Sequence, residues 1–153
     1  MTTAQILEMN RLMKEKLFNF PGEIRAKKAE LETARRILKE AQTALQELEA
    51  EMVAAIAAEV NPNTGKAAFS NAEARGAELI RRKATNKNYA AAYGAVRRAE
   101  EDVNAAQFDL ERLYDEFRAY RYVVDLTARE LALLAVDSHS EGREMERTAA
   151  EPY

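Results

Sequence analysis

The residues best suited to chemistry are basic side chains gathered in one part of the sequence, with tyrosines among them. Residues 61–98, here called the basic segment, hold eight Lys or Arg and two Glu, a charge of +6 between flanking segments of −5. Lys and Arg donate hydrogen bonds to phosphates, and aromatic rings stack on bases, so this pattern indicates a site for a nucleotide or a nucleic acid. The expected ligand-binding residues are Lys66, Arg75, Arg81, Arg82, Lys83, Lys87, Tyr89, Tyr93, Arg97 and Arg98.

Arg81 and Arg82 are the first choice for a phosphate, because guanidinium forks grip phosphate oxygens in pairs. Both also lie where a short helix is expected to end, and a helix C-terminus favours cations without any ligand. Tyr89 has a second interpretation too, since it falls in an apolar stripe. Packing of the basic segment against an acidic stem could produce the same charge pattern.

Motifs for catalysis or metal binding are incomplete in this chain. Val60 and Ala67 stand where a P-loop ending at Gly65-Lys66 needs Gly and then Ser or Thr. The single histidine, His139, lies in a polar C-terminal segment that offers no rigid scaffold for a catalytic triad. With no cysteine and one histidine, we expect no catalytic residues, no metal and no cofactor. The chain is predicted not to be an enzyme.

A long hydrophobic pattern must position the basic segment. In residues 89–134 apolar side chains recur at alternating steps of three and four, and residues 24–55 carry a similar pattern interrupted at Lys27. This heptad repeat is typical of helices that pair in a coiled coil. We therefore predict an all-α protein whose helices at about 21–60 and 86–136 form a long antiparallel coiled-coil helical hairpin.

The N-terminal part is expected to form a separate short helix. Pro21 disfavours helical geometry at Phe20 and suits the first turn of a new helix, so the first helix should cover residues 3–18. A connection this short sends consecutive helices back alongside each other. We expect the short helix to pack at the base of the hairpin, within a single domain of residues 1–137.

Turn and capping residues mark the other end of the hairpin. Pro62 and Gly65 should end the second helix and begin the tip, residues 61–88. A capping box that begins at Ser70 should start a short helix within the tip. After about Asp137 the apolar pattern ends, and residues 138–153 are expected to form a disordered tail.

A second apolar stripe lies behind the seam of the later helix. A two-helix hairpin cannot bury both faces of that helix, so the stripe predicts a homo-oligomer unless the N-terminal helix covers it. Either arrangement is compatible with the sequence. The expected oligomer interface is Phe108, Tyr122, Leu126 and Leu133.

The loop at the tip resembles a loop in small coiled-coil proteins encoded among the early genes of bacteriophages and prophages. The residues that carry the resemblance are Asn61-Pro-Asn-Thr-Gly-Lys66, Phe69-Ser-Asn71 and Arg75. It implies an early phage role, either in replication or recombination or in blocking host defence by trapping a nucleotide signal. The alternative is a coiled-coil adaptor or inhibitor that binds a host protein.

Location is predicted from what the chain lacks. No apolar run approaches the ~20 residues that a membrane span needs, and the first residues do not have the pattern of a signal peptide. We expect a soluble cytoplasmic protein without membrane contact. For a phage-encoded chain, the compartment would be the cytoplasm of the bacterial host.

Overall fold

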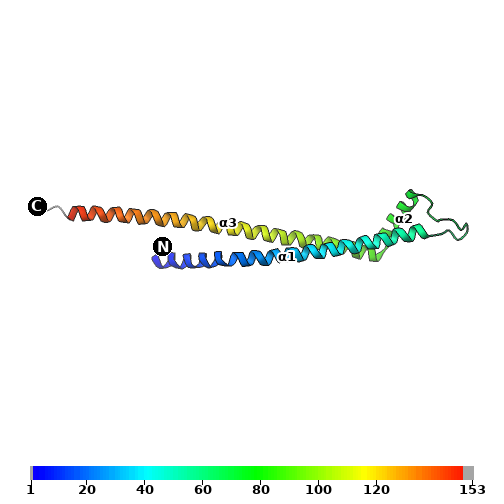
Figure 1. The fold of residues 1–153 in the computed structure, drawn as a ribbon, viewed down its shortest axis with the longest axis horizontal. Coiled ribbons are helices and arrows are strands. Elements are labelled where there is room, and N and C mark those ends of the chain that lie inside the picture. The colour runs from blue at the N-terminus through cyan, green and yellow to red at the C-terminus, as the bar shows by residue number, and fades with distance from the viewer. Residues whose placement is uncertain (1, 150–153) are drawn as a thin grey trace. The chain divides into compact units, whose positions relative to one another are not determined.

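The computed structural model describes residues 2–149, with side chains for all of these except Thr3 and residues 137–149. This part of the chain contains no strand, and its helices are α1 (Thr3–Ala58), α2 (Ala72–Thr85) and α3 (Lys87–Ala149) (Figure 1). Helices α1 and α3 pack against each other. The prediction of an all-α protein is confirmed.

The described chain divides into two compact units. Unit 1 contains the described residues up to Arg25 and from Leu110 onward, and unit 2 contains Ala26–Asp109. Each unit therefore holds one segment of α1 and one segment of α3, and unit 2 also holds α2.

An aromatic cluster forms the centre of unit 1. The Phe20 ring from α1 is fully buried, and its centroid lies 5.5 Å from that of Phe117 and 5.4 Å from that of Tyr120, both on α3. The rings are tilted at 59° and 60°, which is a favourable arrangement for aromatic pairs. Phe20 thus fastens the two helix segments of unit 1 together.

The expected break at residues 19–22 is wrong, because α1 continues through Pro21 as one helix. A proline inside a helix removes one backbone hydrogen bond and costs ~3 kcal/mol or more. Burial of a large apolar side chain such as Phe20 returns ~1.5–3 kcal/mol, and packing on both sides of Pro21 adds to it. The short N-terminal helix folded back at the base is therefore absent from the described residues.

A spacing signal for this continuity is present in the sequence. Ile6, Asn10, Met13 and Leu17 are half-buried and lead to Phe20 by steps of four and three. These steps extend the heptad of residues 24–55 toward the N-terminus. The polar residue Asn10 interrupts the apolar repeat in the sequence. Pro21 suggests a helix break at a point where α1 in fact continues.

The core of unit 2 follows the predicted heptad except near the end of α1. Its buried positions include Leu31 and Met52 on α1 and Val96 and Ala99 on α3. Ile56 is only 2% exposed, whereas the predicted seam residue Ala55 is exposed. Ala55 and Ile56 lie three and four residues after Met52, so both are near the same face of the helix. Burying Ile56 removes more apolar surface from water than burying Ala55 would.

The second stripe on α3 is not covered by other described residues. Phe108 is 67% exposed, and Tyr122 and Leu133 are 71% and 67% exposed. Because α1 is one continuous helix, it supplies no folded-back segment that could cover them. Leu131 and Leu134, which the heptad assigns to the first seam, are also exposed.

Helix α3 extends beyond the end of its apolar pattern. The backbone is helical to Ala149. The prediction of a disordered tail is therefore wrong for residues 138–149. Extending an existing helix avoids the cost of nucleation, and no proline occurs before Pro152 to stop it. Residues 150–153 of the expected tail lie outside the described residues.

We expect Phe20→Ala to destabilise the protein by ~3–5 kcal/mol, because it removes a fully buried aromatic ring. The matched control is Phe18→Ala on the same helix, whose side chain is 83% exposed and should change stability by less than ~0.5 kcal/mol. Urea unfolding followed by circular dichroism measures both. Equal effects of the two substitutions would contradict the packing of α1 through Pro21.

Candidate functional site: the basic segment

The loop between α1 and α2 is a turn closed by its own backbone. The Asn61 carbonyl accepts a hydrogen bond from the Gly65 N–H at 2.9 Å, and the Asn61 N–H donates to the Lys66 carbonyl at 2.8 Å. Gly65 has a φ of 65°, a left-handed conformation that glycine adopts without steric cost. An antiparallel bridge joins Val60 to Ala67. The N–H groups of Asn61 and Gly65 thus serve the turn and are not directed at a ligand.

Asparagine side chains start both helices of the basic segment. The Asn71 side-chain oxygen accepts a hydrogen bond from the Ala74 N–H at 2.7 Å, so α2 is capped by Asn71 rather than by the predicted Ser70. The Asn86 side chain accepts a hydrogen bond from the Tyr89 N–H at 3.0 Å and caps α3. These caps fix where each basic side chain leaves its helix.

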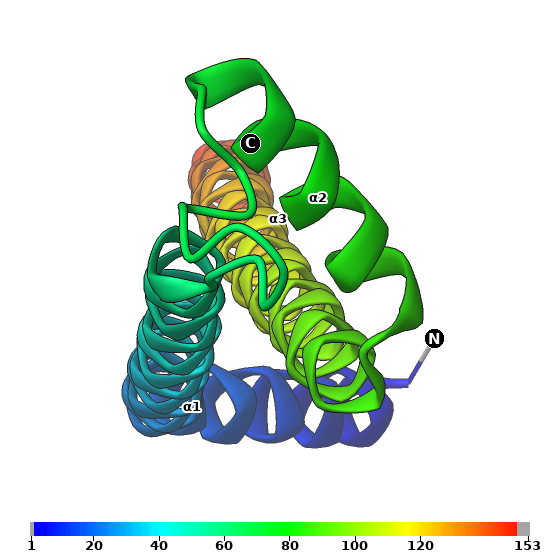
Figure 2. The same cartoon turned by 90° about the vertical axis from the view of Figure 1, so that its right-hand side faces the viewer.

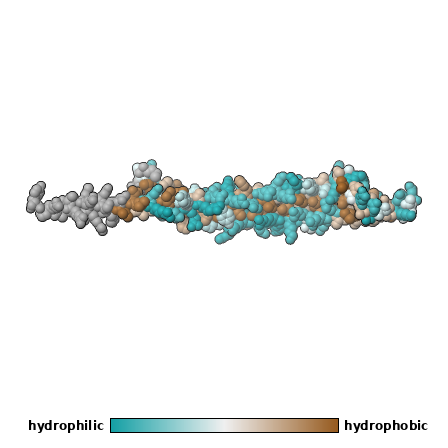
Figure 3. Space-filling view, turned by 90° about the horizontal axis from the view of Figure 1, so that it is seen from above, coloured by the Kyte–Doolittle hydropathy of each residue, from teal (hydrophilic) through white to brown (hydrophobic). Residues whose placement is uncertain are grey.

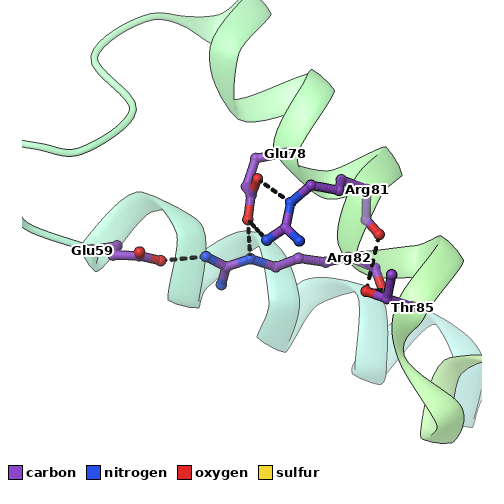
Figure 4. A network of polar contacts seen from close by, with 5 residues as sticks. All are labelled: Glu59, Glu78, Arg81, Arg82 and Thr85. Carbon is purple, nitrogen blue, oxygen red and sulfur yellow. Dashed lines mark hydrogen bonds and ion pairs between the residues drawn. The ribbon is translucent and has the colours of Figure 1, made fainter.

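Arg81 and Arg82 are held by carboxylates within unit 2 (Figure 4). Arg81 donates from Nε and Nη2 to the two Glu78 oxygens at 2.8 and 2.7 Å, and Arg82 Nε donates to Glu78 Oε1 at 2.6 Å. The other end of the Arg82 guanidinium pairs with Glu59, just after the end of α1. These hydrogen bonds, those from Arg81 first, lower the pKa of Glu78 from 4.5 to about 2.

A second cluster joins α2 to both long helices. Lys83 Nζ donates to Glu49 Oε1 on α1 at 2.7 Å, and the Tyr89 hydroxyl on α3 donates to the same oxygen at 3.0 Å. The Lys83 ammonium lies 5.3 Å from the centre of the Tyr89 ring, and Tyr93 stacks on that ring at 6.3 Å. The hydrogen bond from Lys83, followed by that from Tyr89, lowers the pKa of Glu49, whereas burial and then Glu49 raise the pKa of Tyr89.

These two clusters attach α2 largely through charge. None of its residues is buried, and it lies beside α3 and the end of α1 (Figure 2). Its ion pairs to α1 and the adjoining loop are Lys83–Glu49 and Arg82–Glu59. Half-exposed ion pairs of this kind are worth up to ~1 kcal/mol each and weaken in salt. The position of α2 should therefore be more sensitive to ionic strength than the helix seam.

The remaining expected ligand residues lie at the surface of unit 2. Lys66, Lys87, Arg97 and Arg98 are exposed, and no ion pair to them is found among the residues that the structure describes. Arg75 makes one long hydrogen bond, from Nη1 to the Phe69 carbonyl at 3.5 Å. The structure thus gathers Lys83, Tyr89 and Tyr93 around one carboxylate, and binds Arg81 and Arg82 to another.

The residues that hold the basic side chains in place are carboxylates, and none of them is among the residues predicted from the sequence for this site. Glu49 and Glu59 come from the acidic flank at residues 40–60, and Glu78 lies inside the basic segment. The charge pattern could have identified the first two, since an acidic stem beside a basic tip predicts mutual packing. Part of the charge segregation is therefore explained by contacts within the fold.

No protein-family model, curated protein or solved structure matches this chain. Across the described residues, no helix is long and apolar enough to cross a membrane. The same residues contain no group of three or more His, Cys, Asp or Glu side chains placed to hold a metal ion.

The Glu78 network should have a measurable pH dependence. The Glu78 pKa is about 2 in the folded protein, below its ordinary value of 4.5, so the stabilisation is complete above pH ~4.5 and is lost as the pH falls toward 2. We expect the wild-type melting temperature to exceed that of Glu78→Gln by a constant amount from pH 7 to 5. The difference in melting temperature should then shrink toward zero at pH 2. A difference that stays the same from pH 7 to pH 2 would contradict the network.

Proposed function

We propose that this chain is a non-enzymatic, antiparallel coiled-coil hairpin that works by binding another protein. Contacts inside unit 2 support the antiparallel direction. Lys27 on α1 lies 3.7 Å from Asp109 on α3, while Glu49, further along α1, contacts Tyr89, which is earlier on α3. Residues later in α1 thus contact residues earlier in α3, as an antiparallel seam requires.

The same direction accounts for the exposed seam residues of unit 1. Phe20 faces Phe117, and equal steps back along α1 and forward along α3 bring Thr3, where α1 begins, opposite Leu134. The seam positions Leu131 and Leu134 therefore lie at the end of the pairing, which agrees with their exposures of 44% and 64%. The apolar pattern of the first seam therefore ends at the start of α1, where the pairing also ends.

A groove in unit 1 carries the proposal. It has a volume of about 460 Å³, and its lining is mixed: Met9, Leu12, Met13 and Tyr120 supply apolar surface, and Glu15, Lys16 and Asn19 supply polar groups. Leu12 is 54% exposed and Met9 38% exposed. Grooves of this kind bind an amphipathic helix through apolar side chains spaced three or four residues apart, and methionine adapts its shape to such a guest.

Anion binding at the tip is less well supported than protein binding at the groove. Its best phosphate ligands, Arg81 and Arg82, already hold Glu78, and Lys83 holds Glu49. An anion would have to displace these carboxylates. We infer that the protein is an adaptor or inhibitor of another protein, and the loop's resemblance to phage early proteins suggests a host protein as the partner.

Amphipathic helical peptides displayed as a library test the groove. Selection on the full-length wild type should enrich peptides with apolar residues at i, i+3, i+4 and i+7. Leu12→Glu should weaken their binding at least ~10-fold, since a charge cannot be buried under the guest. Lys14→Glu is the control, because Lys14 is exposed and does not line the groove. Failure to enrich any peptide that distinguishes Leu12→Glu from wild type would overturn the proposal.

A second candidate is anion binding at the cations that the carboxylates leave exposed. Lys66, Lys87, Arg97 and Arg98 supply it, because no ion pair is found for them in the described part of the chain. Such a site would bind single-stranded DNA in a strongly salt-dependent way, or a single nucleotide saturably.

Titration of labelled single-stranded DNA and of cyclic nucleotides at low and moderate salt tests this candidate. We expect Arg97→Glu with Arg98→Glu to reduce any binding at least ~10-fold, because each charge reversal replaces attraction to a phosphate by repulsion. Arg35→Glu with Arg36→Glu is the matched control, since it makes the same charge change elsewhere in unit 2. Equal losses in both variants, or no binding by wild type at low salt, would remove the candidate.

A further inference from the structure

We propose that two copies of this chain associate through a second heptad seam on α3 in unit 1. The exposed apolar residues Tyr122, Leu126, Leu133 and Val136 follow one another at steps of four, seven and three. Ala119 and Arg129 fill the missing places, so the steps from Ala119 to Val136 alternate between three and four throughout. This is the pattern of a helix with a second coiled-coil partner.

The exposed fractions show that this second seam is uncovered. They are 71% for Tyr122, 46% for Leu126, 67% for Leu133 and 66% for Val136. Figure 3 shows hydrophobic surface, in brown, over the C-terminal part of α3 whose side chains are described. Monomeric proteins seldom leave a continuous apolar patch of this kind exposed.

Leu131 and Leu134 add to this surface. Both lie where the first seam reaches the start of α1, and they are 44% and 64% exposed. Residues 131–136 are therefore apolar on several sides of the helix, with Leu133 and Val136 on the second seam. A helix that is apolar all round needs neighbours on more than one face.

A second copy fits the seam better in an antiparallel than in a parallel arrangement. In a parallel pair every seam residue meets its own counterpart, which would place two Arg129 side chains together in the middle. In an antiparallel pair, Tyr122 packs on Leu133 of the second copy, Ala119 on Val136 and Leu126 on Arg129. Each such layer occurs twice by two-fold symmetry.

Charge and size are complementary in this antiparallel register. The aliphatic part of Arg129 covers Leu126 of the second copy, and its guanidinium lies beside Asp125, the preceding residue of that copy. The large Tyr122 and the small Ala119 each face a branched aliphatic side chain. Like charges face each other in none of the layers between residues 119 and 136.

The seam is short, which sets the expected affinity. Residues 119–136 span ~27 Å at 1.5 Å per residue, so the interface lies at or below the lower end of stable protein interfaces. We therefore expect a reversible dimer in the micromolar range. The groove around Leu12 uses none of the residues of the second seam, so dimer formation does not depend on the proposed function.

Sedimentation equilibrium of the full-length chain from about 1 to 100 μM should span the change from monomer, at 17.2 kDa, to dimer. Leu133→Glu should weaken dimerisation at least ~10-fold, because it buries a charge against Tyr122 of the second copy. Phe18→Glu is the matched control: its side chain is 83% exposed in the same unit and lies outside the seam. Circular dichroism should show that both variants remain helical.

Cysteine crosslinking tests the register, and the absence of native cysteine makes it clean. Tyr122→Cys combined with Leu133→Cys should form covalent dimers under mild oxidation, because these positions face each other across the antiparallel pair. Within one helix they lie ~16 Å apart, too far for an internal disulfide. Each single variant should crosslink much more weakly.

Three results would overturn the proposal. They are a monomer at every concentration, equal weakening of the dimer by Phe18→Glu and Leu133→Glu, and crosslinking of Tyr122→Cys alone as efficient as that of the double variant. The last result would indicate a parallel pair. A dimer that survives in Leu12→Glu would show that self-association is separate from the groove.

Discussion

The packing of α1 against α3 is the interaction on which the rest of this structure depends. Most helical stability in proteins comes from the packing of an amphipathic face, and α2 has no buried residue of its own. In unit 1 the packing centres on Phe20, and in unit 2 on Leu31, Met52, Ile56, Val96 and Ala99. Small residues such as Ala99 let two helix backbones approach closely, so modest side chains can still make a dense core.

Charges at the tip act mainly as internal attachments. Glu78 holds two arginines, and Glu49 holds Lys83 and the Tyr89 hydroxyl. The hydrogen bonds from these partners lower the pKa of Glu49 and bring that of Glu78 down to about 2. A segment that looks like a ligand site by charge alone thus serves to position α2, and a binding function has to use the cations left outside these clusters.

Apolar surface is the feature of unit 1 that the fold does not use. The groove around Leu12 lies between α1 and Tyr120 of α3, whereas the stripe through Tyr122 lies on α3 alone. A groove between two helices fits a single guest helix, while a stripe with heptad spacing fits a helix of the same repeat. The two surfaces together suit a dimer that presents two copies of one docking groove.

The sequence by itself determined the helical class, the turn at Gly65, and the positions in unit 2, such as Leu31, Met52, Val96 and Ala99, at which α1 and α3 bury apolar side chains, because these follow from local spacing and turn chemistry. It did not determine the course of α1 at Pro21. Local propensity favours a break there, and it is offset by tertiary packing, of which the burial of Phe20 between Phe117 and Tyr120 is the largest part next to Pro21. Nor could it choose between a ligand and Glu78 as the partner of Arg81 and Arg82, since a cation is satisfied by whichever anion the tertiary fold brings within reach.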